Sequence, residues 1–205
     1  MRVRYRSYSD GGISPILAIL VVNLLIYVFI FIVSRIAPQL ALQIILLLAL
    51  PMPAGFLSQP WSILTSVFLH IEFWHIFGNM ITLYFFGTYF NRLVGEKSFL
   101  IVYFVGGIVG NFFLLLLSGL APYPAALGAS GAVFALAGGL VVMRPRLPVI
   151  IFPIPIPMPL FVAVLGGFVI LSFLPWVAWQ AHLGWLIVGL IAGYISRRRE
   201  VYSFF

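Results

Sequence analysis

The sequence predicts an all-α polytopic membrane protein with six transmembrane helices and a first outer loop that dips into the membrane. Three observations lead to this prediction. Of the 205 residues, 63% are hydrophobic and only 7% are charged, and the mean hydropathy is +1.19. Apolar runs of nearly spanning length recur along the chain, and the basic residues gather between alternate runs. A water-soluble fold would not hide so much apolar surface, so the solvent around most of the chain is lipid.

The apolar runs, taken in order, give the expected elements. A transmembrane helix needs roughly 20 apolar residues. The runs that we expect to cross the membrane are Ile13–Val33, Phe73–Phe90, Phe99–Leu117, the run from Leu127 to just before Arg144, Leu160–Leu174 and Ala181–Ile195. One further run, Leu40–Leu50, is broken by Pro51 and Pro53 and is too short for a comfortable span.

The basic residues decide whether Leu40–Leu50 crosses. If it does not, ten of the eleven basic residues lie on one side of the membrane and only Arg35 lies opposite. If it does, the split is three to eight. The rule that positive residues stay on the cytoplasmic side favours the first arrangement. We therefore expect both termini in the cytoplasm, and we expect residues 36–60 to form an outer loop that dips without crossing.

These spans imply one membrane domain with two short tails. We expect a cytoplasmic tail over residues 1–12, a six-helix domain over 13–196, and a short basic cytoplasmic tail over 197–205. Between the fourth and fifth spans, prolines alternate with apolar residues over Pro148–Pro159. Proline is excluded from helix interiors and central strands, so we expect an extended polyproline connector there. The expected location is a membrane, the plasma membrane if the source is prokaryotic.

Strongly polar groups inside or beside spans are costly and are functional candidates by default. The set comprises Asn23, His70, His75, Asn79, Asn111, Ser130, Gln180 and His182. The topology places His70, His75 and Asn79 where the second span begins at the outer face. It places Ser130 in the first turn of the fourth span and His182 at the start of the sixth. Three polar clusters therefore share one depth near the outer face.

The spacing within the clusters has chemical meaning. His75 and Asn79 are four residues apart and share a helix face. Gly128 and Gly131 flank Ser130 and allow other backbone to approach, and a serine at a helix start has free N–H groups beside it.

Small residues also follow two of these polar residues. Gly131, Ala135 and Gly139 form one stripe, and Gly189 and Gly193 form another. Such stripes let helices pack closely. If the two stripes face each other, Ser130 meets His182, which places a nucleophile beside a base.

Several other chemistries are excluded. The chain has no cysteine, so it has no thiolate nucleophile or thiolate metal site. Its only aspartate is Asp10, in the tail, which excludes an aspartyl pair within the membrane. His70, Glu72 and His75 do not have the spacing of a zinc protease motif. We expect no metal, no cofactor and no nucleic-acid partner, since the apolar background assigns the net charge of +7 to the lipid surface.

Together these residues resemble the rhomboid family of intramembrane serine proteases. The matching motifs are His70-x4-His75-x3-Asn79, Gly128-x-Ser130-Gly131, and Ala181-His182 followed by Gly189 and Gly193. Trp61 in the first outer loop also fits. The resemblance implies a six-helix rhomboid-like bundle that hydrolyses peptide bonds in or near transmembrane segments of membrane-protein substrates.

The resemblance also implies a role for each site residue. Ser130 would be the nucleophile and His182 the general base and acid. His75, Asn79 and Gly128 would form the oxyanion and substrate-stabilising group, together with the Ser130 backbone N–H. His70 and Gly131 would support them. No cofactor is implied, and the partners are transmembrane substrates and lipid.

The chain departs from the family pattern at three positions. Ser62 stands where arginine is frequent, Asn91 where glutamate is frequent, and Trp185 where glycine is usual. Trp185 would place a bulky ring near the contact between the Ser130 and His182 helices. One alternative function is a catalytically inactive rhomboid-like protein that binds membrane clients. Another is a small transporter, against which the location of the polar set near one face argues.

Overall fold

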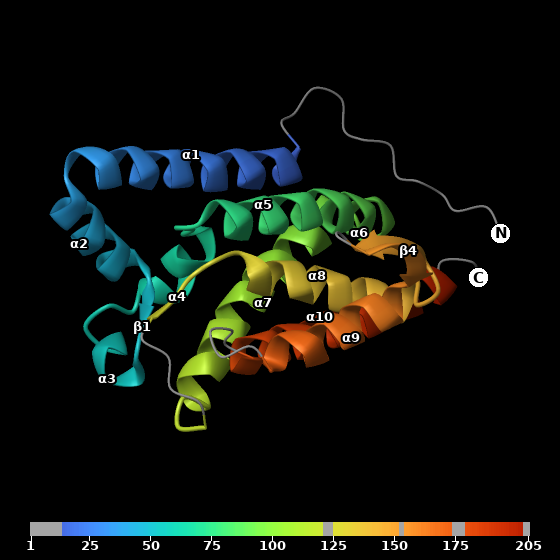
Figure 1. Ribbon diagram of the computed structural model, residues 1–205. Helices are drawn as coiled ribbons and strands as arrows, with labels where there is room; N and C mark the ends of the chain where they lie inside the picture. Colours follow the sequence, from blue (N-terminus) through green and yellow to red (C-terminus); the bar gives the residue numbers. More distant parts are fainter. Residues whose placement is uncertain (1–13, 121–124, 152–153, 174–178, 203–205) are drawn as a thin grey trace.

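A computed structural model describes residues 14–120, 125–151, 154–173 and 179–202 of the chain. Within these ranges the chain is mostly helical, and its helices pack side by side in a bundle (Figure 1). The expected tail over 1–12, the loop at 121–124 and the last residues, 203–205, lie outside the described residues.

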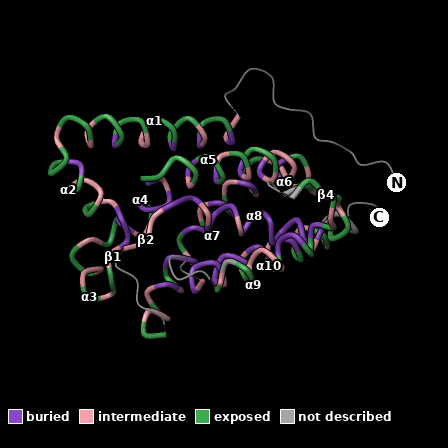
Figure 2. Tube along the Cα trace, in the orientation of Figure 1, coloured by how far each residue is buried: buried purple, intermediate pink, exposed green. Residues whose placement is uncertain are grey.

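The first helix, α1 (Pro15–Ile36), is long and apolar enough to cross a membrane. Proline suits the first position of a helix, because a backbone N–H at that position has no hydrogen-bond partner within the helix. Only Ile16, Ile19, Asn23 and Ile30 of α1 are buried, and the rest of the helix is largely exposed (Figure 2). Because its exposed residues other than Arg35 are apolar, α1 presents a lipid-facing surface at the side of the bundle.

The run Leu40–Leu50 forms a short helix, α2 (Pro38–Leu48), of 11 residues. At about 1.5 Å per residue it reaches about 16 Å, against a hydrocarbon core of roughly 30 Å. The first loop continues through β1 (Leu50–Pro51), α3 (Pro53–Phe56), α4 (Ser62–Thr65) and the 3-10 turn η1 (Ser66–Phe68). Trp61 Nε1 donates to the Leu47 carbonyl at 2.9 Å, and Thr65 Oγ1 donates to the Leu48 carbonyl at 2.8 Å. The loop is therefore folded onto the end of α2.

The second expected span is one continuous helical stretch from Phe73 to Val94. It comprises α5 (Phe73–Thr82), a wider π-helical turn η2 (Leu83–Gly87) and α6 (Thr88–Val94). Gly95 ends it with a φ of 84°. The next helix, α7 (Glu96–Leu116), is again long and apolar enough to cross a membrane.

At the centre of the bundle lies α8 (Ser130–Met143), which is buried along almost its whole length. It is flanked by α7 and by α10 (Trp179–Tyr202), and α9 (Leu160–Ser172) packs beside it (Figure 1). The expected stripes face each other: a Cβ on Gly189 would meet the Ala135 carbonyl oxygen, and one on Gly193 would meet that of Gly139. The two backbones are thus in direct contact.

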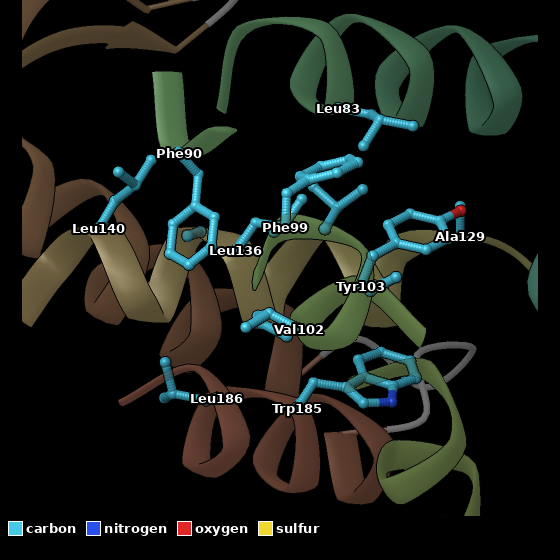
Figure 3. Packing of buried hydrophobic residues seen from close by; sticks show 14 of the residues in the cluster. Leu83, Phe90, Phe99, Val102, Tyr103, Ala129, Leu136, Leu140, Trp185 and Leu186 are labelled. Carbon is cyan, nitrogen blue, oxygen red and sulfur yellow. The ribbon is translucent and has the colours of Figure 1, made fainter. Parts of the chain in front are cut away.

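Trp185 does not separate α8 from α10. Its indole instead occupies a notch between α7 and α8, where a Cβ on either Gly110 or Gly131 would overlap it. The ring is 5% exposed and belongs to the main apolar cluster, which includes Leu83, Phe99, Val102 and Tyr103 (Figure 3). Gly131 therefore makes room for an indole rather than for a neighbouring backbone.

The expectation of a polyproline connector over Pro148–Pro159 is wrong. The segment forms a two-stranded antiparallel hairpin of β3 (Pro148–Ile151) and β4 (Ile154–Pro159), in which Pro148 pairs with Pro159 and Val149 with Met158. Both strands of a lone pair are edge strands. Proline is tolerated there where its nitrogen faces away from the partner strand.

Candidate active site

Ser130 is the first residue of α8 and is partly buried. The segment before it carries β2 (Ala125–Ala126), which pairs with β1 of the first loop. His75 and Asn79 lie one turn apart on α5, and His70 lies in the loop that precedes α5. The structure brings His70, His75 and Asn79 beside the chain that leads into Ser130.

His70 joins α5 to that chain. Its Nε2 lies 3.1 Å from Asn79 Nδ2 and accepts the Ala129 backbone N–H at 3.2 Å. The nitrogen that accepts this backbone donor carries no proton. Burial lowers the pKa of His70 to about 3, and the nearby His75 acts in the same direction. A neutral His70 therefore holds Asn79 and the Ala129 backbone together at ordinary pH.

A second contact holds the same chain one residue earlier. The Gly128 N–H donates to the Ser66 carbonyl at 2.8 Å. The Ser66 hydroxyl in turn accepts from Asn111 Nδ2 at 2.9 Å, and Asn111 also donates to the Ile63 carbonyl at 2.9 Å. Two consecutive N–H groups before Ser130 are thus fixed by the segment 63–70.

Sequence reasoning did not single out Ser66, because its partner, the Gly128 N–H, belongs to the backbone and leaves no pattern in the sequence. Asn111 did carry a signal, since an amide within an apolar helix needs a hydrogen-bond partner. The structure supplies that partner and connects it to the chain before Ser130.

Two features of the structure, the backbone conformation and the closeness of His75, require glycine at position 128. Its φ is +114°, a region that residues with a Cβ rarely adopt. A Cβ at this position would also overlap the imidazole of His75. His75 therefore lies directly over the backbone that leads to Ser130, with 5.0 Å between its ring centroid and that of His70.

His182 lies on α10 and is buried, with 6% exposure. It stacks on Phe134, with 4.8 Å between ring centroids, and contacts Trp185 on its own helix at 4.9 Å. It is also close enough to His75 to interact electrostatically. Phe134 is four residues from Ser130, so the two share a face of α8. His182 is thereby placed on the face of α8 that carries Ser130.

No hydrogen bond joins Ser130 to His182 among the described residues. In the same part of the chain, His182 Nδ1 is buried without a partner. Catalytic hydrogen bonds are often long in a site without substrate, and tighten when substrate binds. Among the described residues, Phe134 and His75 are the neighbours that position His182 relative to α8 and α5.

The acidic residue Glu72 lies close enough to His75 to interact with it electrostatically. Glu72 is exposed, at the residue before α5. Ser62 bonds back to the Gln59 carbonyl within the first loop, and Asn91 is buried on α6.

Comparisons with known proteins agree on one family. Residues 57–199 match the family model described as the Rhomboid domain. The mitochondrial Rhomboid protein 1 of Saccharomyces cerevisiae is 33% identical over 163 residues, which are 71% of this chain and 44% of that protein. Rhomboid protease GlpG of Haemophilus influenzae is 30% identical over 143 residues, 69% of this chain and 72% of that protein.

A third relative is named as inactive rather than as a protease. Inactive RHOMBOID-like protein 8 of Arabidopsis thaliana is 39% identical over 56 residues, which are 27% of this chain and 16% of that protein. The chain thus spans less than half the length of the yeast and Arabidopsis relatives.

Proposed function

Since this chain belongs to the rhomboid family of integral membrane proteins, we propose that it is an intramembrane serine endopeptidase that cleaves transmembrane protein substrates. The observation that carries the proposal is the placement of His182 on the Ser130 face of α8, stacked on Phe134. This supports Ser130 as the nucleophile and His182 as its base.

In the proposed reaction, Ser130 Oγ attacks the carbonyl carbon of the scissile peptide bond while His182 takes the hydroxyl proton. The tetrahedral intermediate collapses as His182 returns that proton to the leaving amine. Water then attacks the acyl-enzyme, again with His182 as base, and releases the carboxylic acid and free Ser130. No cofactor or metal takes part in these steps.

The oxyanion of the intermediate requires fixed hydrogen-bond donors. Ser130 opens α8, so its backbone N–H has no partner from an earlier turn of the helix. Asn79 engages His70 through Nδ2, whose second hydrogen is left for the oxyanion. His75 lies over Gly128 and completes the group. Each such donor typically contributes about 3–4 kcal/mol to transition-state stabilisation.

We place the site near the outer face of the membrane and both termini in the cytoplasm, following the distribution of basic residues. Because the chain has no cysteine, single cysteines at Ser118 and Lys97 would report the two sides separately. A membrane-impermeant maleimide added to intact cells should label Ser118→Cys and spare Lys97→Cys.

A fluorophosphonate probe tests the nucleophile directly. The purified protein should be labelled covalently, Ser130→Ala should lose the label, and Ser118→Ala should retain it. Equal labelling of wild type and Ser130→Ala would refute the assignment. If wild type neither takes up the probe nor cleaves any transmembrane substrate while membrane clients co-purify, the chain is an inactive, client-binding rhomboid.

A further inference from the structure

The β3–β4 hairpin carries an unusual side-chain composition for a connection between helices. From Leu147 to Leu171 the sequence contains no polar side chain. On the described part of the hairpin, Leu147 and Val149 pack against the main apolar cluster. Ile150 and Ile156, by contrast, are 63% and 65% exposed. The part of the hairpin next to the helices is therefore covered by the bundle, whereas its apolar residues Ile150 and Ile156, nearer the turn, are largely exposed.

The backbone of β4 is also adapted to a medium with little water. The Leu160 N–H donates to the Leu147 carbonyl at 2.9 Å, and one step along the register Pro148 pairs with Pro159. In an antiparallel ladder the N and O atoms of alternate pairs point outward. Pro159 therefore leaves no outward N–H at its pair, and Pro155 and Pro157 contribute no N–H to the irregular stretch of β4 that lies opposite Ile150, where the register shifts. An outward N–H is the group that lipid cannot satisfy.

The lengths of the neighbouring helices place the hairpin at membrane depth. The 14 residues of α8 and 13 residues of α9 reach about 20 Å each at about 1.5 Å per residue. A hydrocarbon core measures roughly 30 Å. The apolar hairpin lies at the end of the bundle where α8 ends and α9 begins (Figure 1), and it extends the apolar surface there.

Positive charge surrounds the same end of the bundle. Arg144 and Arg146 lie between α8 and β3, and Arg197 on α10 donates to the Val142 carbonyl at the end of α8. Arg146 is exposed. The carbonyl oxygens on the outer edge of β4 still need donors, which interfacial water supplies and the hydrocarbon centre does not. Arginines next to an apolar surface match a layer of anionic headgroups.

We propose that the β3–β4 hairpin is a membrane anchor that inserts Ile150 and Ile156 into the interfacial region of an anionic lipid leaflet. The prolines of β4 remove unsatisfied donors from its lipid-facing edge, and Arg146 binds lipid phosphates beside it. The proposal concerns the end of α8 opposite Ser130, and it is independent of catalysis.

Site-directed spin labelling tests the insertion, because the cysteine-free chain accepts single cysteines directly. Labels at Ile150→Cys and Ile156→Cys are compared in bilayers containing phosphatidylglycerol with two controls. Leu25→Cys on the exposed face of α1 reports lipid, and Lys97→Cys at the start of α7 reports water. We expect the hairpin labels to collide with oxygen more than with a water-soluble nickel complex, at a depth between the two controls.

Two outcomes would overturn the insertion. Hairpin labels with the nickel accessibility of Lys97→Cys would mean that the hairpin lies in water. Labels shielded from both reagents, with spin–spin broadening that disappears on dilution with unlabelled protein, would mean that a second copy covers it.

The lipid charge and the prolines have their own tests with the Ile150→Cys label. The label should lie shallower in pure phosphatidylcholine than in the anionic bilayer, and Arg146→Gln should reduce this difference. Equal depths in both bilayers would overturn the role of anionic headgroups.

Pro157→Ala restores one N–H on β4 and should move the label toward water, whereas Val149→Ala on the covered side should not. No movement with Pro157→Ala would overturn the role of the prolines.

Discussion

The imidazole of His182 stacks on the ring of Phe134, with 4.8 Å between centroids and 30° between planes. Phe134 lies one turn along α8 from Ser130. The stack therefore fixes the ring plane of the proposed base relative to the helix that carries the proposed nucleophile.

Removing this ring should impair the chemical step more than substrate binding. Aromatic pairs contribute about 0.5–1.5 kcal/mol beyond burial, which corresponds to a loss of about 2- to 12-fold in kcat for Phe134→Leu. Phe134→Tyr keeps the stack and should retain most activity. The measurement is kcat and KM on a transmembrane substrate in proteoliposomes. A change in KM alone would contradict a role in holding His182.

The bonds from Asn111 to Ser66 and Ile63 should support the site through the backbone. Asn111→Ala removes both, and leaving buried polar groups unpaired costs about 1–3 kcal/mol. Ser66→Ala removes one bond and keeps the Ser66 carbonyl that holds Gly128, so its effect should be smaller. We expect slower fluorophosphonate labelling in the same order. Loss of thermal stability with an unchanged labelling rate would limit Asn111 to a structural role.

Gly128→Ala should abolish labelling of Ser130, because a methyl group there would overlap His75 and the φ of +114° disfavours it. Such backbone strain costs about 1–3 kcal/mol. Gly78→Ala is the matched control on α5. Nothing lies within 4 Å of its added Cβ, so it should stabilise the helix by about 0.5–1 kcal/mol. Similar behaviour of the two variants would argue against the observed position of His75.

Trp185 and Gly110 should be energetically coupled. Gly110→Ala forces a methyl group into the indole and should destabilise the protein in the presence of Trp185. In a Trp185→Ala background the same change should cost much less, with a coupling of about 0.5–3 kcal/mol. A double-mutant cycle on unfolding measures it. Additive effects would show that the indole does not occupy the notch between α7 and α8.

The pH dependence of stability should report His70. Its pKa is about 3 in the folded protein and 6.5 when unperturbed, so the unfolded chain binds more protons between these values. Stability should therefore be unaffected by His70 above pH 6.5. Below that it should fall as the pH falls, by up to about 1.4 kcal/mol per pH unit. His70→Gln keeps an acceptor without a titrating group and should show a shallower fall. Parallel profiles would contradict a neutral, buried His70.

The helices and the residues of the candidate site were predictable because they leave patterns in the sequence. Apolar runs predicted the helices to within a few residues, except that α10 continues to Tyr202 rather than ending at Ile195. Small residues at 135, 139, 189 and 193 predicted how α8 meets α10. The six-span count and the catalytic roles remain predictions. The hairpin at 148–159 was missed because proline excludes central strands but not the edges of a lone pair. Ser66 was missed because it acts through its backbone carbonyl.

The seam between α8 and α10 has a consequence for how this sequence tolerates change over time. At Gly189 and Gly193 any side chain would meet a carbonyl oxygen of the opposite helix, whereas Gly119, Gly166 and Gly167 face open space. Neutral substitution can therefore replace Gly119, Gly166 and Gly167 at little cost in stability, whereas it cannot replace Gly189 or Gly193 without moving the helices apart. A homologue that lost both seam glycines would have to separate the two helices, and with them the residues at 130 and 182.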